Sequence, residues 1–224
     1  MFGFRISTLL LPALLALPMA AAHAHPRYTV TIVGAPGSSA SDINSSGTVV
    51  GNFPFSDTIN HGFVNAGGVI TDLMTLEGGD QAYARAINDS GVIVGQSTNA
   101  AGLWRAFRHE SGTMLDLGTL GGDNSRAEGI NNRGDIVGTA DIPPTEFSRS
   151  SRAFLLKPGV TMQDLGRFDV PDNEGPSSAV GINEKRQVVG GSAAGPLIGT
   201  EPPFHAFLYA CEELRDLGTL GGQY

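Results

Sequence analysis

The chain repeats one compound pattern four times, and this repetition constrains its fold more than any other feature. Each repeat carries four anchors in the same order: an Ile-Asn pair, a Val-Gly pair, a Phe preceded by a small residue and a His or Arg, and an Asp-Leu pair. The Ile-Asn pairs end at Asn44, Asn88, Asn131 and Asn183, so their spacings are 44, 43 and 52 residues. A period of this length is typical of arrays in which one small unit stacks on the next.

The other three anchors recur at matching positions. The Val-Gly pairs end at Gly51, Gly95, Gly138 and Gly190. The tripeptides end at Phe63, Phe107, Phe154 and Phe207, and the Asp-Leu pairs begin at Asp72, Asp116, Asp164 and Asp216. We therefore divide the chain into repeats of about 37–80, 81–123, 124–170 and 171–224.

Each repeat contains four short segments with the apolar alternation and β-branched content of strands. The first segment ends at Ile-Asn, the second contains Val-Gly, the third carries the Phe and the fourth carries Asp-Leu. Between the first two segments, Asn can bond to the turn backbone and a glycine supplies positive φ; these glycines are Gly47, Gly91 and Gly134. Repeat four has Arg186 at the glycine position, so we expect that turn to be remodelled.

Four antiparallel strands in about 40–45 residues predict a β-propeller blade. The expected fold class is all-β: a β-propeller-like array of about four four-stranded antiparallel blades, in an incomplete or open ring. A β-solenoid is the alternative. Residues 28–34 resemble a fourth strand, which predicts an extra strand before the first blade. One surplus strand leaves sheet edges open, so self-association through those edges is expected.

Nearly all the length variation falls in two of the four connections. The distance from the Asn of Ile-Asn to the Gly of Val-Gly is 7 residues in every repeat, whereas Gly to Phe is 12, 12, 16 and 17 residues. In an up-and-down blade, the connections from second to third strand and from fourth strand to the next repeat emerge together. We call that side the variable edge and the opposite side the fixed edge, and we expect binding at the variable edge.

Residues 1–24 have the charge–apolar–small order of a secretory signal peptide. Arg5 precedes an apolar run that is too short to span a bilayer, and the small residues around His23 offer cleavage after Ala24, with cleavage after Ala22 as the alternative. Residues 25–224 then form the repeat domain. We expect a secreted or periplasmic protein with no membrane span after removal of the signal.

Charge and residue content argue against a nucleic-acid partner, an intramolecular disulfide, and a metal or cofactor site. The net charge is −8 and becomes −9 when Arg5 is removed with the signal, which argues against nucleic acid. Cys211 is the single cysteine, so no intramolecular disulfide can form. The histidines and cysteine lack the spacing of a zinc site, and no cofactor fingerprint is present, so neither metal nor cofactor is expected.

The candidate binding residues lie where the variable connection enters the third strand. They are His61, Arg105, Arg152 and His205, which as a series would suit an acidic or sugar ligand. Their alternative role is to extend beside a core Phe. Trp104, the one tryptophan, would stack on a sugar or be a half-buried strand residue. A catalytic group need occur only once, so we interpret the recurring Asn, Gly, Phe and Asp positions as structural.

The combined pattern resembles a known family. INDSGVIVG, the tripeptide with His or Arg, and DLGTLGG together are similar to the HAF family of probable extracellular repeat proteins, over residues 28–224. The tripeptide that names the family stands at His205-Ala206-Phe207. The resemblance implies an exported bacterial protein with propeller-like repeats and carries no activity. Arg186 and the DLGRFD segment of repeat three depart from the pattern.

The functional prediction is an exported, non-catalytic repeat protein whose variable edge binds an extracellular glycan, peptide or surface partner. One alternative is a propeller hydrolase or lyase acting on extracellular polysaccharide. It requires an acid pair that occurs once on the variable edge, from among Glu146, Asp169, Asp172, Glu174 and Glu201. The other alternative is a non-functional fragment of a longer array.

Overall fold

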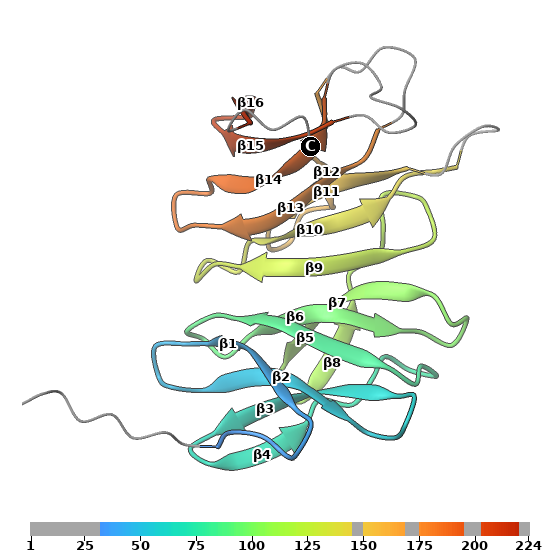
Figure 1. Cartoon of the computed structure of the whole chain (residues 1–224), viewed down its shortest axis with the longest axis vertical. Coiled ribbons are helices and arrows are strands. Elements are labelled where there is room, and N and C mark those ends of the chain that lie inside the picture. Colours follow the sequence, from blue (N-terminus) through green and yellow to red (C-terminus); the bar gives the residue numbers. More distant parts are fainter. Residues whose placement is uncertain (1–31, 145–149, 169–174, 195–202, 220–224) are drawn as a thin grey trace, which may run out of the picture. The chain divides into compact units, whose positions relative to one another are not determined.

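Four antiparallel sheets follow one another along the chain (Figure 1). The computed structural model describes residues 32–144, 150–168, 175–194 and 203–219, and within these ranges it contains sixteen strands and no helix. Every sheet has four strands hydrogen-bonded in sequence order, and none closes into a barrel. The prediction of a propeller-like all-β array is therefore confirmed.

The strand bounds repeat from sheet to sheet. The first sheet contains β1 (Ser39–Ile43), β2 (Val49–Pro54), β3 (Asn60–Ala66) and β4 (Val69–Asp72). The second contains β5 (Ala82–Ile87), β6 (Ile93–Thr98), β7 (Trp104–Glu110) and β8 (Thr113–Asp116). The third contains β9 (Ser125–Ile130), β10 (Ile136–Asp141), β11 (Ser151–Leu156) and β12 (Gln163–Asp164). The fourth contains β13 (Ser177–Ile182), β14 (Val188–Ala193), β15 (Phe204–Ala210) and β16 (Glu213–Gly218).

The extra strand predicted at residues 28–34 falls mostly outside the described residues. Residues 28–31 lie outside the described ranges, and residues 32–34 are not in a strand. The carbonyl of Val33 instead accepts a hydrogen bond from Asn65 Nδ2 at 2.8 Å. This segment therefore lies against the third strand of the first sheet without adding to its backbone ladder.

The turn between the first two strands has the same geometry in all four sheets. In the second sheet, Asn88 Oδ1 accepts the backbone N–H groups of Ser90 and Val92 at 3.1 and 3.0 Å. The glycines at the turn have φ of 80°. Arg186 adopts the same left-handed conformation, with φ of 60°, and its N–H still bonds to the Asn183 carbonyl at 3.0 Å. The expected remodelling of that turn is therefore wrong, because Asn183 holds the turn as its equivalents do.

The Val-Gly glycine is required by a β-bulge in the neighbouring first strand. Each first strand shifts register opposite this glycine. The bulge directs a carbonyl at the glycine, so that a Cβ on Gly138 would lie 2.0 Å from the Arg126 oxygen. No side chain fits in that space, which explains why glycine occupies this position in every repeat.

The hydrophobic core lies between successive sheets. We call the face that packs on the next sheet the forward face, and the face that packs on the preceding sheet the backward face. At the first interface, forward-face Val50 and Leu73 pack with backward-face Ile87 and Phe107. The equivalent clusters form around Val94 with Phe154 and around Val137 with Phe207. All four repeat phenylalanines are buried.

A ladder of asparagines joins the sheets at the fixed edge. Asn44 Nδ2 donates to the carbonyl of Asn88 at 3.2 Å, Asn88 Nδ2 to that of Asn131 at 3.1 Å, and Asn131 Nδ2 to that of Asn183 at 3.1 Å. Asn183 Nδ2 bonds instead to Gln187 Oε1, in its own turn, at 2.8 Å. Asn44, Asn88 and Asn131 thus order their own turns and also set the register with the next sheet, whereas Asn183 orders its own turn.

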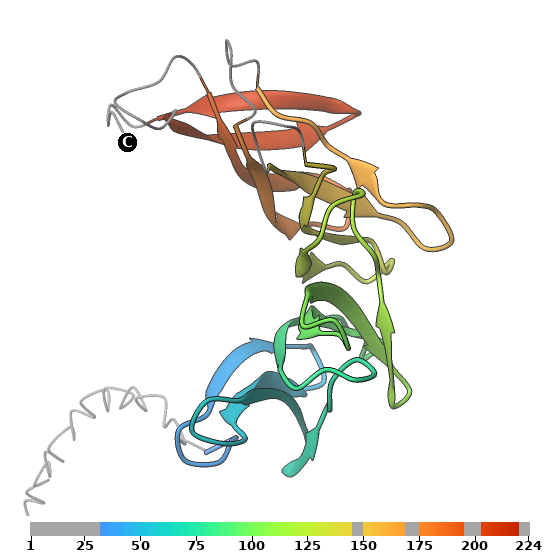
Figure 2. The same cartoon turned by 90° about the vertical axis from the view of Figure 1, so that its right-hand side faces the viewer.

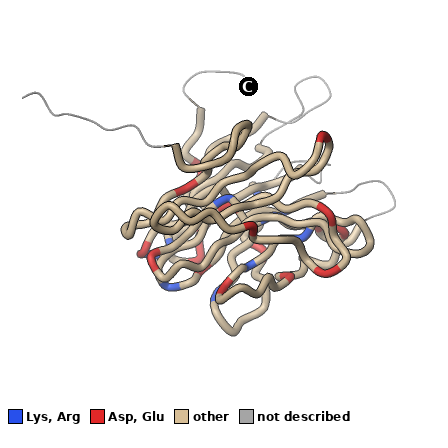
Figure 3. The backbone as a smooth tube through the Cα atoms, turned by 90° about the horizontal axis from the view of Figure 1, so that it is seen from below, with Lys and Arg blue, Asp and Glu red and all other residues tan. Residues whose placement is uncertain are grey.

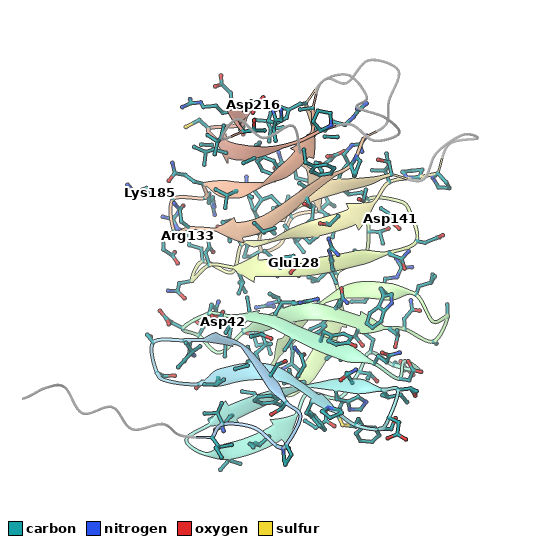
Figure 4. All side chains as sticks on the ribbon, viewed as in Figure 1. Asp42, Glu128, Arg133, Asp141, Lys185 and Asp216 are labelled. Carbon is teal, nitrogen blue, oxygen red and sulfur yellow. The ribbon has the colours of Figure 1, made fainter. Side chains whose placement is uncertain are left out.

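The two edges of the sheets are opposite in space. Arg133 and Lys185, in fixed-edge turns, lie on one side in Figure 4, and Asp141, at the end of β10, lies on the other. Figure 2 shows the same succession of sheets from the side. Acidic and basic positions are interspersed along the backbone (Figure 3). Among the described residues, no helix is long and apolar enough to cross a membrane.

Candidate functional site

The two histidines of the predicted series face the aspartates of the Asp-Leu pairs. His61 Nδ1 lies 2.9 Å from Asp72 Oδ2, and His205 Nδ1 lies 2.9 Å from Asp216 Oδ2. Each pair joins the third strand to the fourth within one sheet. The hydrogen bond from His205 holds the pKa of Asp216 below its ordinary value. These contacts fit a role in aligning neighbouring strands.

The two arginines of the series make different contacts. Arg105 Nε is 3.9 Å from Asp116 Oδ2, too far for a hydrogen bond. Arg152 is buried, and its Nη1 donates to Ser150 Oγ at 2.7 Å and to the carbonyls of Ser151 and Gly175 at 3.1 Å. The series is therefore spread over four sheets, and the structure does not bring its members together into one site.

A cleft of about 330 Å³ opens between the second and third sheets. Its walls come from β6, β7, β9, β10 and β11. The lining residues are Gln96, Trp104, Asn124, Ser125, Arg126, Thr139, Asp141 and Ser151. Most of these flank the connections of the variable edge, where binding was predicted. Trp104 is the one predicted binding residue that the cleft contains.

Asn124 organises the wall of the cleft. Its N–H and its Nδ2 both donate to Asp141 Oδ2 at 3.0 Å, and its Oδ1 accepts the N–H of Trp104 at 3.1 Å. This chain of bonds runs from the third sheet to the second through the connection that joins them. The Asp141 carboxylate and the Trp104 backbone are thus held in fixed positions before any ligand arrives.

The cleft offers mixed polar and aromatic chemistry. Trp104 is half-buried and lies beside Tyr83, with ring centroids 5.7 Å apart and tilted by 44°. The Thr139 hydroxyl is buried and has no hydrogen-bond partner in the described part of the chain. Gln96 and Ser151 add an amide and a hydroxyl, and Asp141 and Arg126 add one charge of each sign. Such a set can donate and accept hydrogen bonds around a neutral polar ligand.

Sequence reasoning missed most of this wall. Gln96 and Thr139 each follow a Val-Gly pair directly, and Ser151 directly precedes Arg152. The sequence therefore showed that these three residues lie next to the repeat anchors. What the sequence did not show is that residues of repeats two and three meet across a sheet interface.

The carboxylates needed for a hydrolase or lyase cannot be placed. Glu146, Asp169, Asp172, Glu174 and Glu201 all lie outside the described residues. Asp141 is the carboxylate among the residues that line the cleft. Within the described ranges, no group of three or more His, Cys, Asp or Glu side chains is arranged to hold a metal ion.

Comparisons with known proteins give no assignment. The chain matches no protein-family model, no curated protein and no solved structure. The chemistry of the cleft is therefore what suggests a function.

Proposed function

We propose that this protein is an exported, non-catalytic binding protein that holds an extracellular glycan in the cleft between the second and third sheets. The observation that carries the proposal is the position of Trp104 beside fixed amide, hydroxyl and carboxylate groups at the variable edge. The signal-like N-terminus and the HAF-like repeats support export and an extracellular role.

A glycan suits the cleft better than a peptide. A sugar ring has an apolar C–H face that packs on an aromatic ring and a rim of hydroxyls that both donate and accept hydrogen bonds. Trp104 supplies the aromatic surface, while Gln96, Thr139 and Asp141 supply partners for hydroxyls. A strand-like peptide would require an exposed row of backbone groups along the cleft, whereas the wall presents side chains.

Because the chain has a single tryptophan, its fluorescence reports directly on the cleft. We expect a soluble neutral oligosaccharide from a panel of plant and bacterial glycans to change the emission of Trp104 in a saturable titration. Trp104→Ala should weaken binding about tenfold or more in calorimetry, because it removes the stacking surface, worth about 1–2 kcal/mol. Asp141→Asn should also weaken binding, since it changes the acceptor that positions Asn124.

The control is Phe55→Ala. Phe55 is an exposed aromatic residue near the variable edge, stacked on His61 at 4.2 Å between ring centroids, and it does not line the cleft. Its removal should leave affinity unchanged. Binding that survives Trp104→Ala but is lost with Phe55→Ala would move the site to the first sheet. The absence of any saturable response across the panel would refute glycan binding in this cleft.

A further inference from the structure

The outer faces of the first and fourth sheets carry the same residues that join the sheets inside the chain. At every internal interface, a valine and a leucine of the forward face pack with an isoleucine and one further apolar residue of the backward face. These quartets are Val50, Leu73, Ile87 and Met114; Val94, Leu117, Ile130 and Met162; and Val137, Leu165, Ile182 and Leu214. The end sheets expose one half of this quartet each.

The forward face of the fourth sheet exposes the valine and the leucine. Val189 is 43% exposed, whereas its equivalents Val50, Val94 and Val137 are fully buried. Leu217 is 56% exposed. Beside Val189 lies a hollow of about 440 Å³, lined also by Ile182, Leu208 and Asn183. This face thus has the composition of an internal interface with nothing packed on it among the described residues.

The backward face of the first sheet exposes the complementary pair. Ile43 is 62% exposed, although its equivalent Ile87 is buried. Ile70 is 47% exposed, and it occupies the position of Met114, which packs on the first interface cluster. The segment around Val33 lies against this sheet, and Phe63 on the same face is buried, but both isoleucines stay exposed.

The polar contacts match as well. Inside the chain, the asparagine amide of one sheet donates to the asparagine carbonyl of the next. Asn183 is the last donor of this ladder, and its Nδ2 turns back to Gln187. The Asn44 carbonyl stands at the other end, where the described residues include no preceding asparagine. Asn131 Nδ2 bonds both to Asp135 in its own turn and to the carbonyl of Asn183 in the next sheet. Asn183 Nδ2 likewise has a second N–H that could donate to the Asn44 carbonyl of another molecule.

We propose that the forward face of the fourth sheet binds the backward face of the first sheet in a second copy of this chain. The contact repeats the internal interface: Val189 and Leu217 of one copy pack with Ile43 and Ile70 of the other, and Asn183 Nδ2 donates to the Asn44 carbonyl. Such a contact is heterologous, so further copies add head to tail until the rotation closes a ring or a filament forms. Separate molecules lose translational freedom when they associate, so the extent of association should depend on protein concentration.

The test uses two variants that block opposite ends of the exported protein. Val189→Lys should abolish association through the forward face, and Ile43→Lys through the backward face, so each should have the molar mass of one chain in light scattering. The equimolar mixture retains one intact face of each kind and should form a complex of two chains and no larger species. Wild type should show a molar mass that rises with concentration.

Both positions are exposed, so the substitutions should leave the melting temperature unchanged, and this is checked for each variant. Val160→Lys is the matched control, because Val160 is 58% exposed in a fixed-edge hairpin of the third sheet, away from both end faces. It should associate as wild type does. A wild type that stays a single chain at millimolar concentration would overturn the proposal. Complexes that persist in both variants, or a mixture that forms none, would overturn it too.

Discussion

At the residue scale, Arg186 is the departure from the repeat pattern that the structure explains. It takes the left-handed position that glycine holds in the other turns, and its Nε donates to Asp135 Oδ2 of the preceding sheet at 2.8 Å. Asp135 is fully buried, and Asn131 Nδ2 donates to the same oxygen at 2.9 Å. Burial acts to raise the pKa of Asp135, but the bonds from Arg186 and Asn131 outweigh it and hold the pKa below its ordinary value. The backbone strain at Arg186 is thus offset by neutralising a buried carboxylate.

This pairing predicts a pH-dependent effect of Arg186→Gly. In wild type, the stabilisation from ionised Asp135 is present above about pH 4 and is lost as the pH falls through its lowered pKa. Without Arg186, burial dominates and the pKa of Asp135 rises. We expect the melting temperature to fall by about 5 °C at pH 7. The difference from wild type should shrink as the pH falls towards 4, because the variant's Asp135, with its raised pKa, takes up a proton there and no longer leaves an unpaired charge buried.

The control for that experiment is the same change in an Asp135→Asn background. There, Arg186 has no charge to neutralise and glycine relieves the left-handed conformation, so Arg186→Gly should be neutral or stabilising. An equal loss of stability at pH 7 and pH 4, or an equal loss in both backgrounds, would show that Arg186 acts through its backbone alone.

At the element scale, each sheet is shaped by the bulge that opposes the Val-Gly glycine. The bulge carbonyl would lie 2.0 Å from a Cβ on Gly190, and the Phe207 ring would lie 2.6 Å away. The adjacent Gly191 has more room, because the nearest atom to its Cβ position is 3.4 Å away on Phe204. Gly190 is therefore required by its surroundings, whereas the adjacent Gly191 is not.

These two glycines form a matched pair for mutation. We expect Gly190→Ala to destabilise the protein by about 3 kcal/mol or more, since backbone and a buried ring must both move. Gly191→Ala should change the free energy of unfolding by less than about 1 kcal/mol. Equilibrium urea denaturation of both variants measures the difference. Similar losses for the two would mean that the bulge shifts easily and does not dictate glycine at the Val-Gly position.

At the scale of the whole molecule, stability comes from sheet-to-sheet interfaces, since each sheet buries its faces on its neighbours. Equivalent residues then contribute according to their place in the array. Val94 lies between the second and third sheets and is fully buried, whereas Val189, on the forward face of the fourth sheet, is partly exposed. Position in the array, and not residue type, should set the effect of a mutation.

The prediction is a contrast between Val94→Ala and Val189→Ala. The first should cost about 2 kcal/mol of unfolding free energy, from lost burial and the cavity left behind. The second should cost less than about 0.5 kcal/mol in dilute protein, where the end face is free. Urea denaturation at low micromolar concentration measures both. Equal losses would indicate that Val189 is covered within the single chain.

The sequence by itself determined the local features of this protein. The number of units, their four strands, the turns capped by Asn and Gly and the separation into fixed and variable edges all follow from anchors that lie close together in the chain. Interactions between residues close in sequence depend on backbone conformation and on the alternation of apolar and polar side chains. In a repeat protein, both recur at the same positions of every unit. For the candidate site, the sequence predicted its position at the variable edge but not the residues that would line it.

Only the tertiary structure decided which distant residues meet. Trp104 and Asp141 share a cleft, and Arg186 reaches Asp135, because stacking brings separate repeats together at a register that no single repeat specifies. The same stacking kept His61, Arg105, Arg152 and His205 apart, one in each sheet. It also left Val189 and Ile43 exposed, although their equivalents in other repeats are covered. Identical local sequence therefore acquires different roles, since burial depends on the neighbouring sheet.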